Sequence, residues 1–372
     1  MSDLDLYIGL MSGTSMDGVD GVLLDFSHSS HSGPAVMQYA CAPFAPELRA
    51  ELLALNTAGE NELHRAALAA NALVQVYAQV VAQLMAQAKL TPADIQAIGA
   101  HGQTVRHRPG EFDATGYTLQ LNNPALLAEL TGIDVVADFR SRDVAAGGQG
   151  APLVPAFHQE MFARPNECVA VLNIGGISNL SVLETSIVGF DCGPGNALMD
   201  YWCQQHTGHM YDADGRWASK GRVLEPLLTV LLSEPFFSKT PPKSTGRDLF
   251  NALWLQHHLE KFSNLSPADV QATLTEFTAR ACAISLNSYA NNSKRLIVCG
   301  GGALNGYLMQ RLQLALPGVM VANSADHGLP PLQVEAAAFA WLARKTIRRE
   351  TASLKSVTGA RGSRILGAIY PV

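Results

Sequence analysis

The chain has 372 residues, of which 48% are hydrophobic and 16% charged, as expected for a folded rather than a disordered protein. Its net charge of −6 does not indicate the basic face of a nucleic-acid-binding protein, and no run of about 18 uninterrupted apolar residues predicts a membrane span. The six cysteines are scattered without a C-x-x-C pair, and the first residues lack a signal-peptide pattern. We therefore expect a cytoplasmic protein with reduced thiols that binds neither nucleic acid nor membranes.

The first part of the chain begins with a predicted hairpin. Apolar residues alternate over 4–10, which is typical of a strand, and recur at helical spacing over 61–89. The elements expected in chain order are strands 4–10 and 19–26, helices 44–56 and 61–89, strand 95–100, a hairpin over 105–122, helix 124–131, strand 133–138 and a helix near 153–163.

A second strand–turn–strand pattern begins at residue 169 and resembles the first, because both carry Ile-Gly, then a serine, then an apolar strand. The remaining expected elements are strands 169–174, 177–183 and 187–190, a helix after Asn196, helices 222–233, 248–262 and 267–290, strand 295–299, and helices 303–315 and 331–349. One such hairpin in each half predicts a duplicated α/β fold with mixed sheets, flanking helices and a central cleft.

Glycine-rich turns follow four apolar strands, at 12–18, 175–178, 193–195 and 300–302. Glycine allows backbone N–H groups to converge on an oxyanion, so four such turns together favour phosphate binding, although any one could be an ordinary tight turn. A helix follows the last turn, and its N-terminus could bind a ribose or phosphate. There a tight turn between strand and helix is an equally good interpretation.

The first turn, Gly13-Thr14-Ser15-Met16-Asp17-Gly18, adds hydroxyl groups and a carboxylate. Hydroxyls and amides suit a terminal phosphate, and the Asp17 carboxylate could hold Mg²⁺ directly or through water. The turn lacks the Walker A pattern and precedes a strand. A polar hairpin turn without function is the alternative.

Asp191 is the best candidate for a catalytic group. It follows the predicted strand 187–190 and precedes Gly193-Pro194-Gly195, which places its carboxylate at the expected carboxyl end of the strand. A carboxylate there can take a proton from an attacking hydroxyl or water. The alternative is that Asp191 caps the helix after Asn196.

Two further polar clusters follow predicted strands. His101, Gln103 and Thr104 come after strand 95–100, where a histidine could equally be structural. Arg140 and Arg142 come after strand 133–138, and arginine suits bidentate capture of a carboxylate. Surface charges balanced by Asp138 and Asp143 are the alternative.

The sequence contains no G-x-S-x-G, no G-x-G-x-x-G after the first strand and no H-E-x-x-H, which disfavours hydrolase, dehydrogenase and metalloprotease functions. The whole chain instead resembles the anhydro-N-acetylmuramic acid kinase family, part of the actin, hexokinase and heat-shock-70 superfamily. The motifs that carry this resemblance are residues 9–20 (GLMSGTSMDGVD), 101–104 (HGQT), 138–140 (DFR), 173–179 (NIGGISN), 190–196 (FDCGPGN), 244–248 (STGRD), 299–305 (CGGGALN) and 357–360 (VTGA).

The resemblance implies a two-lobed actin-like, ribonuclease-H-like fold and an ATP-dependent sugar kinase of peptidoglycan recycling. Water would open the 1,6-anhydro ring of 1,6-anhydro-N-acetylmuramic acid, and O6 would take the γ-phosphoryl of ATP, giving N-acetylmuramic acid 6-phosphate and ADP. ATP and Mg²⁺ are the implied cofactors and a homodimer the implied assembly. We expect a first lobe of 1–130 plus 350–372 with the ATP phosphate hairpin. The second lobe, 131–349, would carry the catalytic aspartate and an adenosine-binding turn.

Residue by residue, the resemblance makes Asp191 the base that activates water and Glu335 an acid near the active site. The lactyl carboxylate of the sugar becomes the natural partner of Arg140. The implied ATP-binding residues are Gly13, Thr14, Ser15, Met16, Asp17, Gly18, Val19, Asp20, Gly175, Gly176, Gly300, Gly301, Gly302 and Asn305. The implied sugar-binding residues are His101, Gln103, Thr104, Asp138, Arg140, Ser178, Asn179 and Asn196.

Two alternatives stay open within this superfamily. A conventional hexose or N-acetylhexosamine kinase would use Asp191 to deprotonate a substrate hydroxyl. A nucleotide-switched, actin-like binding protein would hydrolyse ATP without any sugar.

Overall fold

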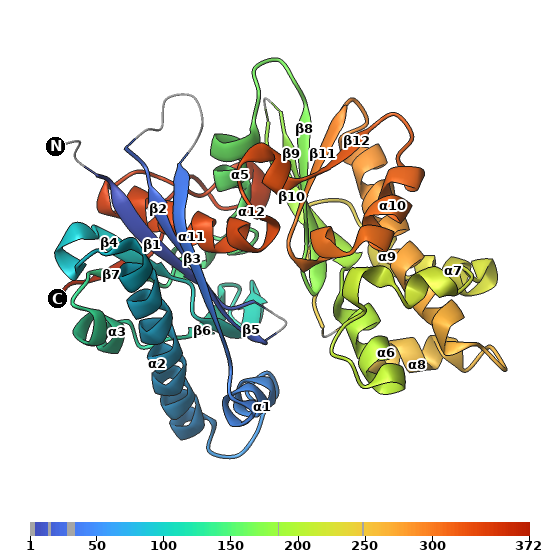
Figure 1. Ribbon diagram of the computed structural model, residues 1–372, viewed down its shortest axis with the longest axis horizontal. Helices are drawn as coiled ribbons and strands as arrows, with labels where there is room; N and C mark the ends of the chain where they lie inside the picture. Colours follow the sequence, from blue (N-terminus) through green and yellow to red (C-terminus); the bar gives the residue numbers. More distant parts are fainter. Residues whose placement is uncertain (1–3, 14–15, 28–33, 185, 248) are drawn as a thin grey trace. The chain divides into compact units, whose positions relative to one another are not determined.

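A computed structural model describes residues 4–13, 16–27, 34–184, 186–247 and 249–372 (Figure 1). The chain forms two compact units, the first made of Met1–Met161 and Leu332–Val372 and the second of Phe162–Pro331. These boundaries differ from the expected lobes, 1–130 plus 350–372 and 131–349. The reason is that β7 (Val135–Ala137) pairs with a strand of the first sheet and α11 (Val334–Ile347) packs on that sheet.

The first unit contains a six-stranded mixed sheet in the order β13-β7-β4-β1-β2-β3. Its other strands are β1 (Leu6–Met11), β2 (Gly18–Asp25), β3 (Ala35–Pro43), β4 (Ala97–Ala100) and β13 (Ala368–Tyr370). The predicted opening hairpin is confirmed, because β1 and β2 pair antiparallel with Leu6 opposite Asp25 and Met11 opposite Asp20. β4 then pairs parallel to β1.

Helices cover both faces of this sheet, so every residue of β1 is buried. Helix α2 (Glu62–Ala88) packs against β2 and β3, and α11 packs against β1, β2 and β4. The close approach of α11 requires glycine beneath it: a Cβ on Gly9 would overlap the carbonyl oxygen of Ala336, and one on Gly99 that of Phe339. These two glycines therefore fix the height of α11 above the strands.

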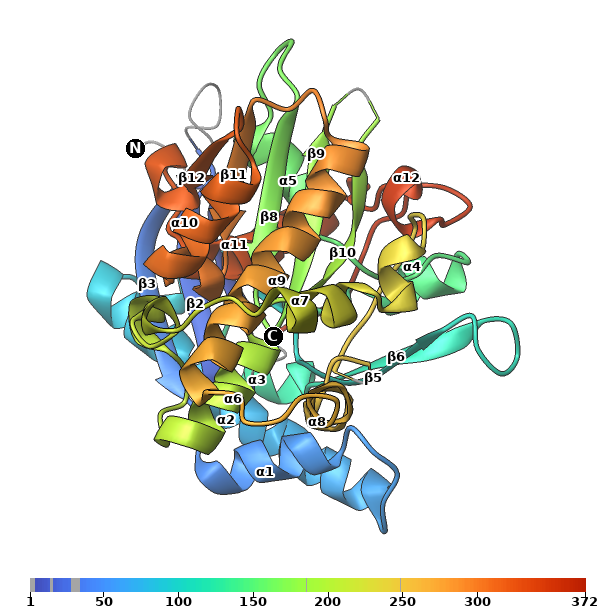
Figure 2. The same cartoon turned by 90° about the vertical axis from the view of Figure 1, so that its right-hand side faces the viewer.

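The rest of the first unit surrounds this sheet. A separate two-stranded ribbon, β5 (Gln103–Pro109) and β6 (Gly116–Leu121), extends from the end of β4 (Figure 2). The remaining helices are α1 (Pro46–Ala54), α3 (Pro124–Thr131), α4 (Ser141–Ala145), α5 (Pro155–Phe162) and α12 (Lys355–Thr358).

The second unit repeats the strand order of the first. Its sheet runs β10-β9-β8-β11-β12, and the first sheet contains the same succession as β3-β2-β1-β4-β7. In both units three strands form an antiparallel meander and the next two run parallel to its first strand. The strands are β8 (Val169–Ile174), β9 (Ile177–Leu183), β10 (Val188–Pro194), β11 (Arg295–Cys299) and β12 (Met320–Asn323). The predicted duplicated α/β fold with mixed sheets is confirmed.

Helix α9 (Pro267–Tyr289) is the central helix of the second unit and runs across its sheet (Figure 2). Fifteen of its residues are buried, and it contacts the neighbouring helices as well as β9 and β10. Those helices are α6 (Ala197–Thr207), α7 (Glu225–Leu232) and α10 (Gly306–Ala315), with α8 (Ala252–Leu259) packed on α6 and α7.

Among the described residues, one helix, α2, is long and apolar enough by length and composition to cross a membrane. Its apolar side chains have another explanation, because Leu73, Val74, Tyr77 and Val80 are fully buried in the core of the first unit. This composition is that of a core helix.

Candidate active site

The predicted phosphate turn connects β1 to β2 in the first unit. The Met16 N–H donates to the Gly13 carbonyl over 3.2 Å, and the Arg49 side chain donates from Nε to the Met16 carbonyl over 3.0 Å, so one backbone and one side-chain hydrogen bond hold the turn. Gly18 and Val19 begin β2, and Asp17 is exposed. The Thr14 and Ser15 hydroxyls, on which the phosphate hypothesis also depends, lie outside the described residues.

Gln103 ties this turn to the start of β5. Its side-chain amide Nε2 donates to the Gly13 carbonyl over 3.1 Å, and Ser12 Oγ donates to the Gly102 carbonyl over 3.2 Å. Gln103 is 1% exposed, and its Oε1 has no hydrogen-bond partner among the described residues. An unsatisfied buried acceptor is costly, which favours a ligand donor at this position. Thr104 Oγ1 instead accepts from Gln120 Nε2 and thereby supports the β5–β6 ribbon.

The structure brings His101 and Arg140 into contact, although the sequence placed them in separate polar clusters. Arg140 directs Nε and Nη2 at His101 Nε2 over 3.2 and 2.9 Å, so this ring nitrogen is the acceptor and the imidazole is neutral. Burial, followed by the charge of Arg140, lowers the pKa of His101 well below its usual value. The ring also packs on Phe339, with 4.6 Å between ring centroids. His101 therefore orients the Arg140 guanidinium.

The alternative interpretation paired Arg140 and Arg142 with the carboxylates of Asp138 and Asp143, and both carboxylates have other contacts. Asp138 is exposed, and its Oδ1 accepts from the Ser141 N–H over 3.3 Å at the start of α4. Asp143 is fully buried and accepts from the Gly150 N–H and the Thr358 hydroxyl.

Asp20 and Glu335 form a pair of neighbouring acids in the first unit. Burial raises the pKa of Glu335 to about 7, and the charge of Asp20 adds to this effect while Arg140 opposes it. Burial also raises the pKa of Asp20, opposed by the Tyr39 hydroxyl, which donates to Asp20 Oδ1 over 2.6 Å. With a pKa of about 7, Glu335 can gain or lose a proton near neutral pH, and the two neighbouring carboxyl groups could share a cation. Its burial and its neighbour Asp20 thus make Glu335 a stronger candidate for a proton-transfer or cation-binding role than the sequence alone did.

In the second unit the structure corrects the placement of Asp191. β10 does not end at residue 190 but continues to Pro194, with Asp191 opposite Asn179 and a register shift between Asp191 and Gly193. Such a bulge leaves an extra residue and re-aims the neighbouring side chain. The carboxylate is not a helix cap: Asp191 Oδ2 accepts from the Thr245 N–H over 2.9 Å, while the Asp191 N–H donates to the Lys243 carbonyl over 3.2 Å.

The glycine turn after β8 holds the segment that follows β10. The Gly175 and Gly176 carbonyls accept from the N–H groups of Gly195, Asn196 and Ala197. Asn196 Nδ2 donates to the Ile174 carbonyl over 3.2 Å, and the fully buried Ser178 Oγ donates to the Pro194 carbonyl over 3.5 Å. These contacts show that the residues build the turn, and the ligand-binding roles predicted for them stay predictions.

The turn after β11 is a short 3₁₀ helix, Gly301–Leu304. Gly300 has a φ of 77°, and its N–H donates to the Pro331 carbonyl over 3.1 Å. Gly301 is exposed and Gly302 buried. Asn305 caps α10, because its Oδ1 accepts from the Leu308 N–H over 3.0 Å. The tight-turn interpretation thus accounts for Asn305, and nucleotide binding at 300–302 stays a prediction.

Sequence reasoning gave no role to several residues that support the site. Thr245 lies in the motif 244–248, and that motif was the available signal for its contact with Asp191. Lys243, next to it, lies over the aromatic rings of Phe236 and Phe190, with Nζ 4.7 and 5.8 Å from their centroids. Burial lowers the pKa of Lys243, opposed by the charges of Cys192 and Asp191. No local sequence pattern indicated the contacts of Lys243 with the two aromatic rings.

Solved structures with similar folds include two nucleotide complexes. One is a ROK family glucokinase from Streptomyces griseus with glucose and AMPPNP, at 14% identity and a TM-score of 0.44, covering 91% of this chain and 99% of that one. The other is the activator of 2-hydroxyisocaproyl-CoA dehydratase from Clostridium difficile with ADPNP, at 13% identity and a TM-score of 0.47, covering 92% and 96%.

Sequence comparison matches residues 5–372 to the profile of the family described as anhydro-N-acetylmuramic acid kinase. Relatives of that name include proteins from Variovorax paradoxus, 66% identical over 374 residues and 99% of each chain, and Albidiferax ferrireducens, 63% identical over 389 residues and 99% of each. The protein from Bordetella pertussis is 57% identical over 371 residues, covering 98% of this chain and 96% of the relative. With matches along its whole length, this chain belongs to the anhydro-N-acetylmuramic acid kinase family.

Proposed function

We propose that this chain uses ATP and water to convert 1,6-anhydro-N-acetylmuramic acid into N-acetylmuramic acid 6-phosphate and ADP. Membership of the kinase family supports the reaction class and ATP as co-substrate. The observation that carries the mechanism is the Asp191 carboxylate, held by the Thr245 N–H beside a β-bulge. This hydrogen bond fixes the orientation of the carboxylate, which can then accept a proton from a nearby water.

In the proposed reaction Asp191 takes a proton from the water that attacks C1 of the sugar. The new C1–O bond forms as the bond between C1 and O6 breaks, and O6 takes the γ-phosphoryl group as its bond to ADP breaks. Water thus supplies the oxygen at C1, the anhydro bridge supplies O6, and the proton resides on Asp191 until it is released to solvent. General-base catalysis of this kind contributes about 10²–10⁴-fold.

Arg140 is proposed to bind the lactyl carboxylate of the sugar. Its guanidinium is oriented by neutral His101 and by the Gly150 carbonyl, which accepts from Nη1 over 2.8 Å. A planar guanidinium held at two edges is prepared for charge-assisted hydrogen bonds to a carboxylate. Gln103 Oε1, buried and unpaired among the described residues, is proposed to accept a hydrogen bond from the same sugar.

The proposed ATP contacts are residues 13–20, Gly175, Gly176 and the 300–302 turn, as the resemblance implies. Among the described residues no group of three or more acids, histidines or cysteines could hold a metal ion alone. Kinases need no such cage, because Mg²⁺ is commonly held by one or two carboxylates together with substrate phosphates. Asp20 and Glu335, whose pKa values are both raised, fit that donor set. When bound, Mg²⁺ would neutralise charge on the transferred phosphoryl group.

The base assignment is tested with Asp191→Asn. We expect turnover with ATP and the anhydro sugar to fall by about 10²–10⁴-fold while thermal unfolding and ADP affinity stay unchanged. Glu260→Gln, at a side chain 74% exposed on the same unit, is the matched control and should keep normal turnover. Wild-type turnover in Asp191→Asn would refute the assignment. ATP hydrolysis that needs no sugar would favour the nucleotide-switched alternative.

Two expectations remain proposals about the protein in the cell. We propose a homodimer and a cytoplasmic location. Sedimentation velocity at micromolar concentration should show a species of twice the chain mass of 39.7 kDa, and cell fractionation should find the enzyme with cytoplasmic markers. A single species at the monomer mass would contradict the first proposal.

A further inference from the structure

Asp143 is a buried carboxylate for which the proposed reaction has no direct use. It lies on α4 and is 0% exposed, so it cannot touch a substrate. Oδ2 accepts from the Gly150 N–H over 2.8 Å, and Oδ1 accepts from the Thr358 hydroxyl over 2.8 Å. Charge-assisted hydrogen bonds of this kind are about twice as strong as neutral ones, so the two partners are held firmly in place.

Gly150 connects this carboxylate to Arg140. While the Gly150 N–H donates to Asp143, the Gly150 carbonyl accepts from Arg140 Nη1 over 2.8 Å. Gly150 has a φ of 67°, a left-handed conformation that few other residues adopt at low cost. The Asp143 N–H also donates to the Arg140 backbone carbonyl over 3.1 Å, so Asp143 contacts both Arg140 and Gly150. Asp143 therefore controls where one edge of the guanidinium is held.

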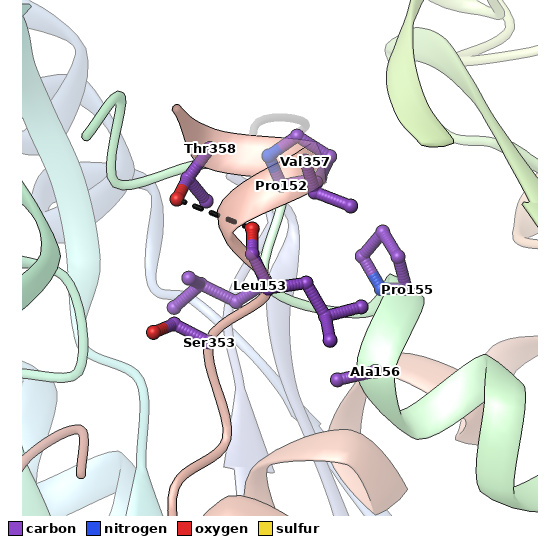
Figure 3. Close-up of a pocket in the computed structure, with 8 residues that line it drawn as sticks. Pro152, Leu153, Pro155, Ala156, Ser353, Val357 and Thr358 are labelled. Carbon is purple, nitrogen blue, oxygen red and sulfur yellow. Dashed lines mark hydrogen bonds between the residues drawn. The ribbon is translucent and has the colours of Figure 1, made fainter. Parts of the chain in front are cut away.

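Thr358 brings the end of the chain into this network. It lies on α12, and its backbone carbonyl accepts from the Gln149 N–H over 2.8 Å, next to Gly150. Figure 3 shows Thr358 among the residues that line a small recess, together with Pro152, Leu153 and Val357. The recess has no interior space even for a water molecule, so neither a sugar nor a nucleotide can occupy it. The recess is thus a packing contact between α12 and the 152–156 segment.

We propose that Asp143 and Thr358 are positioning residues that set the Arg140 guanidinium for the lactyl carboxylate, and so determine the preference for an acidic sugar. The proposal rests on the proposed function of Arg140. The chain of contacts runs from Thr358 through Asp143 and Gly150 to Arg140, with 2.8 Å at each side-chain step. Misplacing one edge of the guanidinium weakens a bidentate interaction with a carboxylate more than contacts to neutral groups.

The test compares Thr358→Val with Thr358→Ser. Valine has the shape of threonine without the hydroxyl, and it leaves Asp143 Oδ1 without this donor, whereas serine keeps the donor and serves as the conservative control. Dissociation constants for the anhydro sugar acid and its methyl ester are measured by calorimetry without ATP. We expect Thr358→Val to weaken binding of the acid about tenfold and of the ester less than twofold, while Thr358→Ser keeps the wild-type ratio.

Two further variants keep the outcomes separable. Asp143→Asn, which preserves size but removes the charge, should also lower the preference for the acid, and it replaces Thr358→Val if that protein does not fold. Arg140→Lys tests the proposed function itself. If wild type prefers the acid and Arg140→Lys loses that preference, but Thr358→Val and Asp143→Asn keep it, the positioning proposal is overturned. Equal binding of acid and ester to the wild type would overturn the role of Arg140 first, and the positioning proposal with it.

Discussion

Glu335→Gln should stabilise the protein above neutral pH and leave it unchanged in acid. The pKa of Glu335 is raised from 4.5 to about 7, chiefly by burial and next by Asp20, so the native state favours the protonated form. Stability from this group is therefore fully present below pH 4.5 and is lost as the pH rises through 7. Glutamine imitates the protonated acid at every pH and removes that loss.

The size of the effect follows from the shift of about 2.5 units between 4.5 and 7. At 1.36 kcal/mol per unit this corresponds to about 3 kcal/mol, reached only above pH 7 and reduced where solvent reaches the half-buried side chain. The variant and the wild type should have equal free energies of unfolding at pH 4.5. Their difference should grow through pH 5–7 and level off near pH 8.

The assay is urea unfolding at pH 4.5, 6 and 8, with Glu350→Gln as a control of opposite sign. Hydrogen bonding to Lys345 lowers the pKa of Glu350, so this variant should lose stability at pH 8 relative to wild type. A difference between Glu335→Gln and wild type that does not change with pH would refute the reasoning. It would show that Glu335 has the same pKa in the native and the unfolded state.

Three further predictions follow from the same structure. Gly9→Ala should destabilise the protein by about 1–3 kcal/mol in urea unfolding, because the new Cβ overlaps the Ala336 carbonyl. Gly59→Ala is the control, because its Cβ would lie near only the Arg65 guanidinium. Equal losses of unfolding free energy in the two variants would contradict the packing argument. Arg344→Met should lower the free energy of unfolding by about 1–3 kcal/mol, because Arg344 is 8% exposed and pairs with Asp5 over 2.7 Å. Arg348→Met, which removes the more exposed partner of Asp5, should lower it less. The reverse order in urea unfolding would be inconsistent with the burial of Arg344. Binding of Mg²⁺ in the presence of ATP should strengthen from pH 6 to 8, because Glu335 must release its proton, and calorimetry on Glu335→Gln should show no such pH dependence.

Local patterns predicted most of the elements but not those whose stability depends on distant partners. The two hairpins and the long helices followed from apolar spacing and glycine turns. β3 was missed because exposed and buried positions along Ala35–Pro43 do not follow a regular apolar alternation, and β12 and β13 have only four and three residues. These strands exist because a neighbouring strand supplies their hydrogen bonds.

The candidate site shows the same limit. The glycine-rich surroundings of Asp191 suggested it as a catalytic candidate, and that role stays a prediction, but its place inside β10 depends on Lys243 and Thr245, more than 50 residues away. Arg344, in the last turn of α11, is buried, with its guanidinium 4.9 Å from the Phe26 ring centroid and paired with Asp5, a contact that no local pattern indicates.

The origin of the oxygen at C1 distinguishes opening of the anhydro ring by water from conventional sugar phosphorylation. The enzyme is incubated with ATP, Mg²⁺ and 1,6-anhydro-N-acetylmuramic acid in ¹⁸O-labelled water, and the phosphorylated product is analysed by mass spectrometry before exchange at C1 becomes significant. We expect one ¹⁸O at C1, none in the bridge to phosphorus, and one ADP per product. A phosphorylated sugar that retains the anhydro ring, or one without label at C1, would contradict it and favour a conventional sugar kinase.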